Sequence, residues 1–293
     1  MSNPGTLVSI GLPVRNAGSR VADVVRSVLA QDHANVELLI TDNASTDDTE
    51  EVCRELAKND DRIAYHRQPR NIGLMNNFGY AIGAAKGTYF RWIGDDDRLA
   101  PDFVSRCLDV FEEDPRLLLV TTGISYLGPD GTAESAAYRG TALASDDPVD
   151  RFVEMLRLLN ESHLVIDPLY GMSRRATVAA IPRRNMLRED EVFATKLALA
   201  GPWRHIPDVL AERVWRTERL SAVARRLDVP SWQWRFATVL QAREMLRWLR
   251  MVELTGEQRR RARAAVYRMY VTRQSRVAER RARKLVQLAH RGR

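Results

Sequence analysis

The first 125 residues alternate between short apolar runs and stretches with helical periodicity, and this alternation constrains the fold more than any other feature. The apolar runs predict five strands, at residues 7–14, 36–41, 63–66, 88–93 and 117–122. Helical patterns separate them, at residues 20–31, 48–57, 74–85 and 101–113. Because parallel strands are joined by right-handed helical crossovers, the order predicts an α/β fold: a Rossmann-like, mostly parallel sheet with flanking helices.

Beyond residue 125 the alternation breaks down. Residues 128–148 are polar and rich in turn formers, which predicts a loop or a hairpin. Next come a predicted helix at 149–159, strands at 169–173 and 209–215, and a helix between them at 191–200. From Trp232 onward the pattern is helical. We therefore predict a domain over residues 1–220 and a helical C-terminal region over 221–293.

The net charge of +7 is concentrated in the last 38 residues. Residues 256–293 hold thirteen Lys and Arg side chains against Glu257 and Glu279, so the rest of the chain is net negative. Apolar side chains form two helical stripes in this tail, Ala262, Val266 and Met269 in the first and Ala278, Ala282, Leu285 and Ala289 in the second. A basic amphipathic helix is typical of binding to an anionic membrane surface. Packing on its own domain or on a second copy is the alternative, and nucleic acid is the least favoured partner.

Signals for export are absent from the sequence. No run of about 18 apolar residues could span a bilayer, and the N-terminus lacks the basic and apolar segments of a signal peptide. Cys53 and Cys107 are the two cysteines, which predicts a reducing compartment and no zinc site. We therefore expect a cytoplasmic protein, either free or bound peripherally to the inner face of the membrane.

Polar loops follow four of the predicted strands, at residues 13–16, 42–45, 70–73 and 95–97. In open parallel sheets ligands bind beyond the carboxyl ends of the strands, so these loops predict a binding site. The first loop is not G-x-G-x-x-G, which argues against a dinucleotide-binding dehydrogenase, and no P-loop motif occurs.

Three adjacent carboxylates, Asp95, Asp96 and Asp97, are the sharpest feature among these loops. Like charges so close repel one another unless a cation or solvent relieves them. Oxygen ligands suit Mg²⁺ or Mn²⁺, and a solvated acidic turn is the alternative. Asp42 ends another strand and could accept hydrogen bonds from a base or a ribose, or else form an Asx turn or a helix cap with Ser45 and Thr46.

The series VSIGLPVRN, LLITDNASTDDT and RNIGLMNNFGYAIGAAKGTYFRWIGDDD resembles the inverting family-two glycosyltransferases of the GT-A fold. The resemblance covers about residues 7–215 and implies a nucleotide-diphosphate sugar donor with Mn²⁺ or Mg²⁺ as cofactor. The residues it assigns to the donor nucleotide are Pro13, Val14, Arg15, Asn16, Asp42, Arg70, Asp95 and Asp96, while Asp97 would bind the metal. Arg15 replaces an aromatic residue of many relatives, and Gly94 replaces a frequent Asp.

The segment Leu187–Glu191 is similar to the family's acidic motif at the start of a helix, and there the resemblance makes Asp190 the catalytic base. A positioned carboxylate can deprotonate the acceptor hydroxyl as it attacks. The alternative is that Glu189 and Asp190 only favour the helix N-terminus electrostatically. Downstream, Arg213 or Arg216 is expected to supply positive charge near the diphosphate, unless both are surface arginines.

The function predicted on this basis is transfer of a sugar to the hydroxyl of a saccharide or lipid-linked acceptor, in synthesis of a cell-envelope polysaccharide or glycoconjugate. A nucleotidyltransferase is one rival, although the first loop lacks the Gly- and Arg-rich sequence with Lys typical of that class. A non-catalytic nucleotide-binding module is the other. Oligomeric state stays open.

Overall fold

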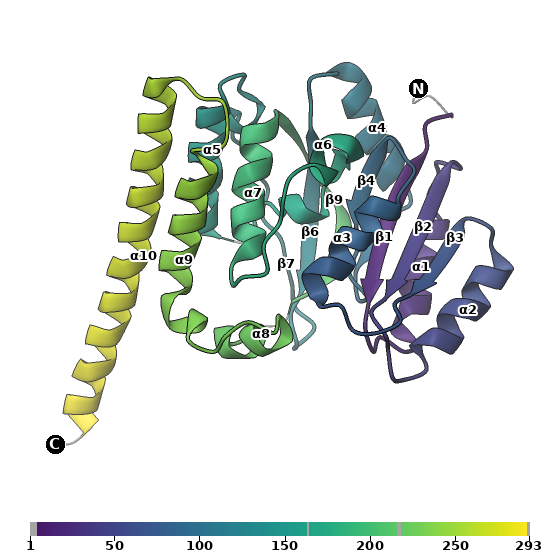
Figure 1. Cartoon of the computed structure of the whole chain (residues 1–293), viewed down its shortest axis with the longest axis horizontal. Coiled ribbons are helices and arrows are strands. Elements are labelled where there is room, and N and C mark those ends of the chain that lie inside the picture. The colour runs from purple at the N-terminus through teal and green to yellow at the C-terminus, as the bar shows by residue number, and fades with distance from the viewer. Residues whose placement is uncertain (1–4, 163, 216–217, 292–293) are drawn as a thin grey trace.

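The computed structural model describes residues 5–162, 164–215 and 218–291, built around a nine-stranded sheet (Figure 1). The strand order is β3-β2-β1-β4-β8-β6-β9-β5, with β7 paired to β6. The strands are β1 (Val8–Val14), β2 (Val36–Asp42), β3 (Ile63–Arg67), β4 (Tyr89–Trp92), β5 (Arg98–Leu99), β6 (Leu119–Leu127), β7 (Ala133–Glu134), β8 (Met172–Arg174) and β9 (Trp203–Val214). The helices are α1 (Arg20–Leu29), α2 (Thr49–Asn59), α3 (Leu74–Ala84), α4 (Phe103–Glu113), α5 (Pro148–Glu161), α6 (Arg175–Ala179), α7 (Glu189–Ala200), α8 (Leu220–Arg226), α9 (Gln233–Trp248) and α10 (Gly256–Arg291).

The N-terminal half confirms the predicted βα alternation. Strands β3, β2, β1 and β4 are parallel neighbours, with Val14 opposite Asp42 and Asp42 opposite Arg67. Their carboxyl ends therefore lie side by side at one edge of the sheet.

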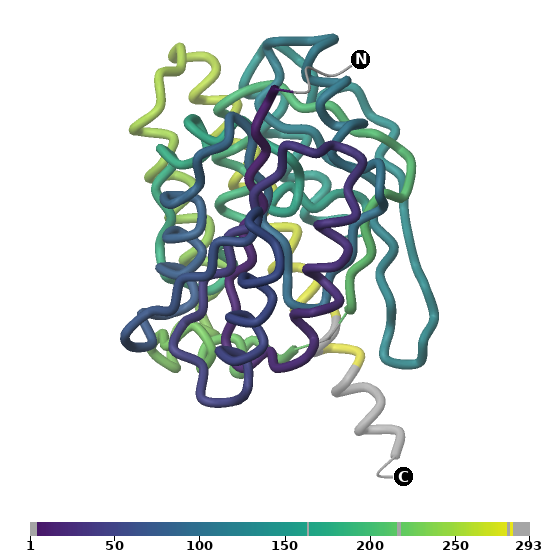
Figure 2. Tube along the Cα trace, turned by 90° about the vertical axis from the view of Figure 1, so that its right-hand side faces the viewer, coloured from purple at the N-terminus to yellow at the C-terminus, as the bar shows by residue number. Residues whose placement is uncertain are grey.

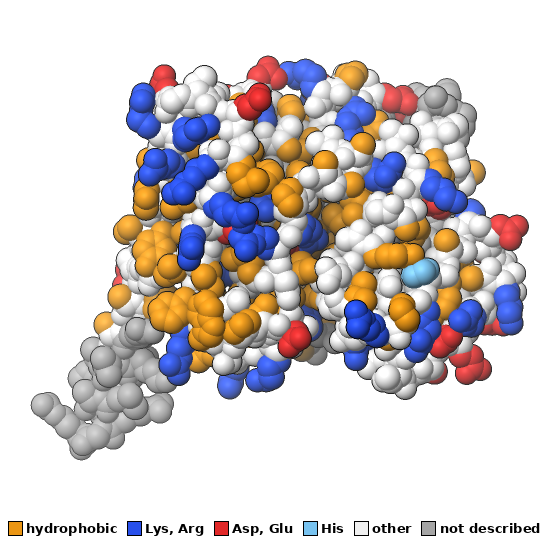
Figure 3. Space-filling view, in the orientation of Figure 1, with side chains coloured by type: hydrophobic (Ala, Val, Ile, Leu, Met, Phe, Trp, Pro, Cys, Tyr) orange, Lys and Arg blue, Asp and Glu red, His pale blue; other side chains and the backbone are white. Residues whose placement is uncertain are grey.

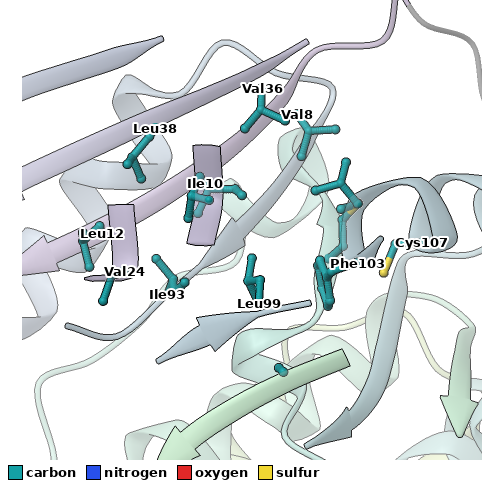
Figure 4. Packing of buried hydrophobic residues seen from close by; sticks show 14 of the residues in the cluster. Val8, Ile10, Leu12, Val24, Val36, Leu38, Ile93, Leu99, Phe103 and Cys107 are labelled. Carbon is teal, nitrogen blue, oxygen red and sulfur yellow. The ribbon is translucent and has the colours of Figure 1, made fainter. Parts of the chain in front are cut away.

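Helices cover both faces of the sheet. On one face, alternate β1 side chains such as Ile10 pack with Val24 of α1 and Phe103 of α4 (Figure 4). On the other face, Trp92 of β4 lies in a cluster with residues of α3, α5 and α7, including Phe193. Burial on both faces explains why these strands are nearly continuous apolar runs.

The second half departs from the prediction in three places. Residues 169–173 do not form one strand: a 3₁₀ turn covers Pro168–Tyr170, and β8 then runs antiparallel to both β4 and β6. Strand β9 starts six residues earlier than expected, because its first part pairs with β6 before a register shift near Gly123. Helix α8 was not predicted, because it spans only seven residues beside Pro230. The predicted hairpin exists as β6 and β7 and projects from the body (Figure 2).

The C-terminal helices pack against the α/β part. Ala262, Val266 and Met269 of α10 are buried in a cluster with residues of α5, α7 and α9. The first apolar stripe of the tail therefore packs on its own chain, as one alternative expected. Of the second stripe, Ala278 and Ala282 are exposed, and the side chains of Leu285 and Ala289 lie outside the described part. The division at residue 220 stays a prediction.

In the described part of the chain, no helix is both long and apolar enough to cross a bilayer.

Candidate functional site at the sheet edge

Hydrogen bonds join the loops that follow β1 and β2. The backbone N–H of Asn16 donates to Ser45 Oγ (2.9 Å), and the Thr46 N–H donates to Asn16 Oδ1 (2.9 Å). Asn16 adopts a left-handed backbone with φ of +53°, a conformation that Asn tolerates better than most residues. The polar sequence of both loops is thus explained by the bonds that connect them.

Two more loops join the same edge. Asn43 after β2 bonds the loop after β3, donating to Asn71 Oδ1 and accepting from the Ile72 N–H (both 2.8 Å). Arg20 pairs with Asp95 after β4 (2.8 Å). The predicted convergence of four loops is therefore present, and Asp42 and Asp97 belong to one edge of the sheet.

The residues assigned to the nucleobase pocket differ in accessibility. Val14 is buried and Pro13 half-buried, whereas Arg15, Asn16 and Arg70 are exposed. The Arg15 guanidinium lies 3.4 Å from the Asn43 carbonyl oxygen. The exposed groups can reach a ligand at this edge, and their contacts to a base stay a prediction.

Asp42 is completely buried and forms the Asx turn that was the alternative to a ligand contact. Its Oδ1 accepts from the Ser45 N–H (2.9 Å) and hydroxyl (2.6 Å). Its Oδ2 accepts from the Tyr65 hydroxyl (2.8 Å). Both carboxylate oxygens therefore have protein partners before any nucleotide binds.

The three carboxylates after β4 have different surroundings. Asp95 is paired with Arg20, and Asp96 is half-buried. Asp97 is completely buried, accepting from the Gly94 N–H (2.8 Å) and from Arg213 Nε (3.0 Å). A solvated acidic turn does not describe Asp97, whose charge is compensated by a guanidinium.

Arg213 connects the acidic loop to the second half of the molecule. It bonds Asp97 on one side and Asp167 on the other (2.5 Å), and its guanidinium lies 3.7 Å from the centre of the Tyr170 ring. Burial alone would lower its pKa, but Tyr170, Asp97 and Asp167 raise the pKa well above its ordinary value. Arg213 is thus a half-buried cation shared by two carboxylates rather than a surface arginine, and a role for it near the diphosphate stays a prediction. Arg216 lies outside the described residues.

The carboxylates of the acidic loop decide which kind of metal site the loop could form. Among the residues that the structure describes, no group of three or more His, Cys, Asp or Glu side chains could hold a metal ion. Magnesium, however, is commonly held by one or two carboxylates together with substrate phosphates. Two carboxylates, Asp95 and Asp96, are not fully buried. The loop therefore fits an ion shared with a diphosphate, and does not fit a site made of protein ligands alone.

A cavity of about 270 Å³ lies beyond Arg213. Its walls are mainly apolar, with carboxylates at one side. They are formed by Tyr126, Met155, Leu158, Leu159, Ser162, Ile166, Asp167, Pro168, Leu169, Asp190, Glu191, Ala194 and Trp215. Asp167 lines this cavity and also bonds Arg213, so the cavity and the acidic loop share a wall.

The three acidic residues at the start of α7 have different surroundings. Glu189 is buried and pairs with Arg183 through both carboxylate oxygens. Glu191 pairs with Arg188 and Arg273, at 2.6 Å each. Asp190 has no ion-pair partner among the described residues and lies at the cavity wall. The helix N-terminus alone does not explain Asp190, because its neighbours carry the structural contacts.

The surroundings of Asp190 suit a general base. The residue is exposed to the solvent of the cavity, yet enclosure by protein raises its pKa to about 6, with a further contribution from the nearby charge of Glu191. Arg188, two residues before it, has a left-handed φ of +60°, which is uncommon for a residue other than glycine and often occurs at functional sites. A carboxyl with this pKa is mostly ionised at neutral pH and can still accept a proton.

Sequence reasoning missed several residues of this arrangement. Asp167, Tyr170, Arg183 and Arg273 carry no motif, and each contacts a partner at least six positions away in sequence. Asp167 stands before Pro168, a signal for a turn, but nothing in the sequence relates it to Arg213.

Comparison with known proteins decides the family. Residues 9–177, more than half of the chain, match Glycosyl transferase family 2. This chain belongs to glycosyl transferase family 2. The matched region includes the four loops and the acidic triplet Asp95–Asp97, but it ends before Asp190.

One family-2 relative and two solved structures extend this result. A chondroitin synthase of Escherichia coli is 27% identical over 224 residues, which cover 76% of this chain and 31% of that protein, so the chain spans less than a third of its length. S. aureus TarS in complex with UDP-GlcNAc superposes with a TM-score of 0.66 at 16% identity, covering 90% of this chain and 72% of TarS. Mannosyltransferase PcManGT from Pyrobaculum calidifontis, in complex with GDP-Man and Mn²⁺, superposes with a TM-score of 0.57 at 15% identity. This match covers 96% of this chain and 77% of PcManGT. The fold is the GT-A fold that the resemblance implied.

Proposed function

We propose that this chain transfers a sugar from a nucleotide-diphosphate sugar to an acceptor hydroxyl, with inversion at the anomeric carbon. Family membership supports sugar transfer, and the complexes of TarS with UDP-GlcNAc and of PcManGT with GDP-Man support a nucleotide-sugar donor. The chondroitin synthase relative supports a product among cell-envelope polysaccharides or glycoconjugates. The acceptor would be a saccharide, free or linked to a lipid. The transferase would lie in the cytoplasm.

One observation carries the proposal: Asp190, a carboxylate with no ion-pair partner among the residues that the structure describes, lines a cavity that shares a wall with the acidic loop. Arg213 spans that wall, bonding Asp97 and Asp167 at 3.0 and 2.5 Å. A donor diphosphate at the loop and an acceptor in the cavity would then meet near Arg213. This arrangement supports Asp190 as the base and the loops at 13–16, 42–45, 70–73 and 95–97 as the donor site.

The proposed reaction is a single displacement at the anomeric carbon of the donor sugar. The acceptor hydroxyl gives its proton to the Asp190 carboxylate while its oxygen forms a bond to the anomeric carbon. The bond from that carbon to the diphosphate breaks, and the electron pair leaves with the nucleoside diphosphate. No covalent sugar–enzyme intermediate is needed, by analogy with one-step inverting hydrolysis.

Positive charge at the loop would favour departure of the diphosphate. Arg213 has a fork-shaped guanidinium of the kind that binds phosphate oxygens, and Tyr170 holds its plane. A divalent ion, Mn²⁺ or Mg²⁺, would offset further negative charge on the leaving group when bound. The loop 95–97 would hold it. Asp97 as its ligand stays a prediction, since Arg213 already bonds that carboxylate.

The test is an assay for the class of reaction. Purified protein with Mn²⁺ and a panel of UDP-, GDP- and dTDP-sugars is expected to release nucleoside diphosphate, and thermal shift is expected to show stabilisation by the matching nucleotide. Release of pyrophosphate from a nucleoside triphosphate and a sugar phosphate would instead establish a nucleotidyltransferase. Stabilisation by a nucleotide without turnover of any donor would favour a binding module.

A further inference from the structure

The outward face of α9 carries an unusual stripe of exposed side chains. They recur at helical spacing, starting from the residue that caps the helix: Trp232, Phe236, Val239, Arg243, Arg247 and Arg250. Trp232 and Phe236 are each 52% exposed and Val239 is 42% exposed. The opposite side of the helix, including Ala237 and Met245, is buried against the body. The stripe is therefore the solvent side of a helix that is already packed.

The N-terminal end of this stripe is aromatic. The rings of Trp232 and Phe236 lie 6.3 Å apart, and Trp234 nearby is 42% exposed. Large apolar side chains that gather on a surface, unlike single scattered ones, mark an interaction site. Tryptophan in particular is enriched where a protein meets the interface between a bilayer and water.

The C-terminal end of the stripe is basic. Between residues 231 and 250 the only acidic residue is Glu244, which is buried and pairs with Arg184 at 2.8 Å and with Arg247 of the stripe at 3.5 Å. Among the described residues, neither Arg243 nor Arg250 has an ion-pair partner. These two exposed arginines therefore present positive charge to the outside.

A groove between α9 and α10 continues the same surface. It encloses about 430 Å³ and is lined by Val239, Ala242, Arg243, Leu246, Arg247, Arg250, Tyr267 and Tyr270. Its lining combines apolar and aromatic side chains with three arginines. Seen from outside, basic and apolar side chains gather over α9 with few acidic ones among them (Figure 3).

We propose that this surface, defined by Trp232, Phe236, Val239, Arg243 and Arg250, docks on an anionic lipid bilayer. Arginines complement lipid phosphates, each contributing about 1 kcal/mol near such a surface, and the aromatic rings reach the interfacial layer. A second copy of the chain fits less well, because the same stripe on that copy offers the arginines no exposed carboxylate: Glu244, the acidic residue of 231–250, is buried. The surface differs from the predicted one, the α10 tail, whose first apolar stripe is buried.

Docking by α9 bears on the proposed transfer reaction. Gln241 of α9 donates to Glu191 (2.9 Å), the neighbour of Asp190 on α7. The docked helix and the proposed acceptor cavity are therefore in adjacent layers, which suits an acceptor held in the membrane. The link between docking and a membrane-held acceptor rests on the proposed function, whereas the docking surface does not.

The experiment is vesicle co-sedimentation with the full chain, using phosphatidylcholine vesicles with and without phosphatidylglycerol. Wild type is expected to bind the anionic vesicles and to lose binding at high salt. Arg243→Gln with Arg250→Gln is expected to weaken binding roughly thirtyfold. Trp232→Ala with Phe236→Ala is expected to weaken it about tenfold. The charge-matched control is Arg26→Gln with Lys58→Gln, on α1 and α2 away from α9 (Figure 1), and it should bind like wild type.

Three results would overturn the proposal. The first is that both α9 variants bind anionic vesicles as tightly as wild type does. The second is that the control variant loses as much vesicle binding as the α9 variants. The third is a dimer in light scattering that the Trp232→Ala, Phe236→Ala variant dissociates, with no vesicle binding by wild type, which would assign the surface to a second copy. Because the substituted side chains are exposed, unchanged thermal midpoints and nucleotide-induced stabilisation would show that the variants fold, and donor turnover tests the transfer reaction separately.

Discussion

Two runs of three acidic residues belong to the proposed site, one after β4 and one at the start of α7, and the structure treats them differently. In the run after β4, Asp97 is the most buried member and Arg213 neutralises it. In the run that begins α7, both flanking residues are neutralised, while the middle one, Asp190, faces a cavity and has no ion-pair partner in the described part of the chain. Partners from distant parts of the chain, rather than the acidic pattern, thus decide which carboxylate is available for proton transfer.

The largest effect is expected at Asp190. Replacing it with Asn preserves the shape but removes the proton acceptor, so kcat for transfer should fall about 10³-fold. Because Asp190 lies in the cavity and not at the donor loops, stabilisation by the nucleotide should be retained in thermal-shift measurements. Full transfer activity in this variant would mean that the two acidic runs do not differ in the way described.

Glu189 is expected to behave as a structural residue. Its carboxylate is buried against Arg183, which itself lies 4.5 Å from the ring of Phe193, so Glu189→Gln would leave a buried guanidinium without its counter-charge. Breaking such a pair typically costs about 3 kcal/mol of unfolding free energy. Denaturant unfolding measures this loss, and Glu191→Gln, whose carboxylate is less buried, is the matched comparison. A larger loss for Glu191→Gln would contradict the assignment.

Substitutions of Arg213 test the acidic run after β4. Arg213→Gln leaves Asp97 and Asp167 without their shared cation, next to the expected diphosphate, and kcat/KM should fall about hundredfold. Arg213→Lys keeps the charge but not the fork, and should recover part of the loss. Steady-state kinetics with varied donor would show this order, and equal rates for the two variants would argue against a role for the fork.

The smallest effect is a shift in pH dependence. Because the base must be ionised, kcat/KM should decline as the pH falls below about 6, the raised pKa of Asp190. Arg273→Gln removes a positive charge 2.6 Å from Glu191, so the pKa of Asp190 should rise and the limb should move to higher pH. Measured pH profiles that coincide would show that Arg273 only anchors α10.

Much of the fold followed from local pattern. The burial of Val24 and Ile10, for example, follows from helical and strand periodicity, and the carboxyl ends then had to meet at one edge. Local pattern failed where pairing decides the structure: β8 is a three-residue strand held by β4 and β6, and the extra length of β9 exists because β6 is beside it.

The residues of the site likewise fall into those that local motifs predict and those whose contacts depend on tertiary packing. The loops and Asp190 could be predicted, because motifs carry them in sequence. Asp42 and Asp97 were named as ligand contacts. The bond between Asp42 and Ser45 was expected as an alternative, whereas the bond from Tyr65 was not. The pairing of Asp97 could not be foreseen, since Arg213 lies 116 residues away. Asp167 and Arg273 were missed for the same reason: tertiary packing creates their contacts.

The most direct test of the account is a crystal structure of the chain with a non-hydrolysable nucleotide-diphosphate sugar, a divalent ion and an acceptor. We expect the diphosphate at the 95–97 loop beside Arg213, and the acceptor hydroxyl within about 3 Å of an Asp190 oxygen, opposite the leaving group. An acceptor hydroxyl bound away from Asp190, or a diphosphate bound outside the four loops, would contradict the account.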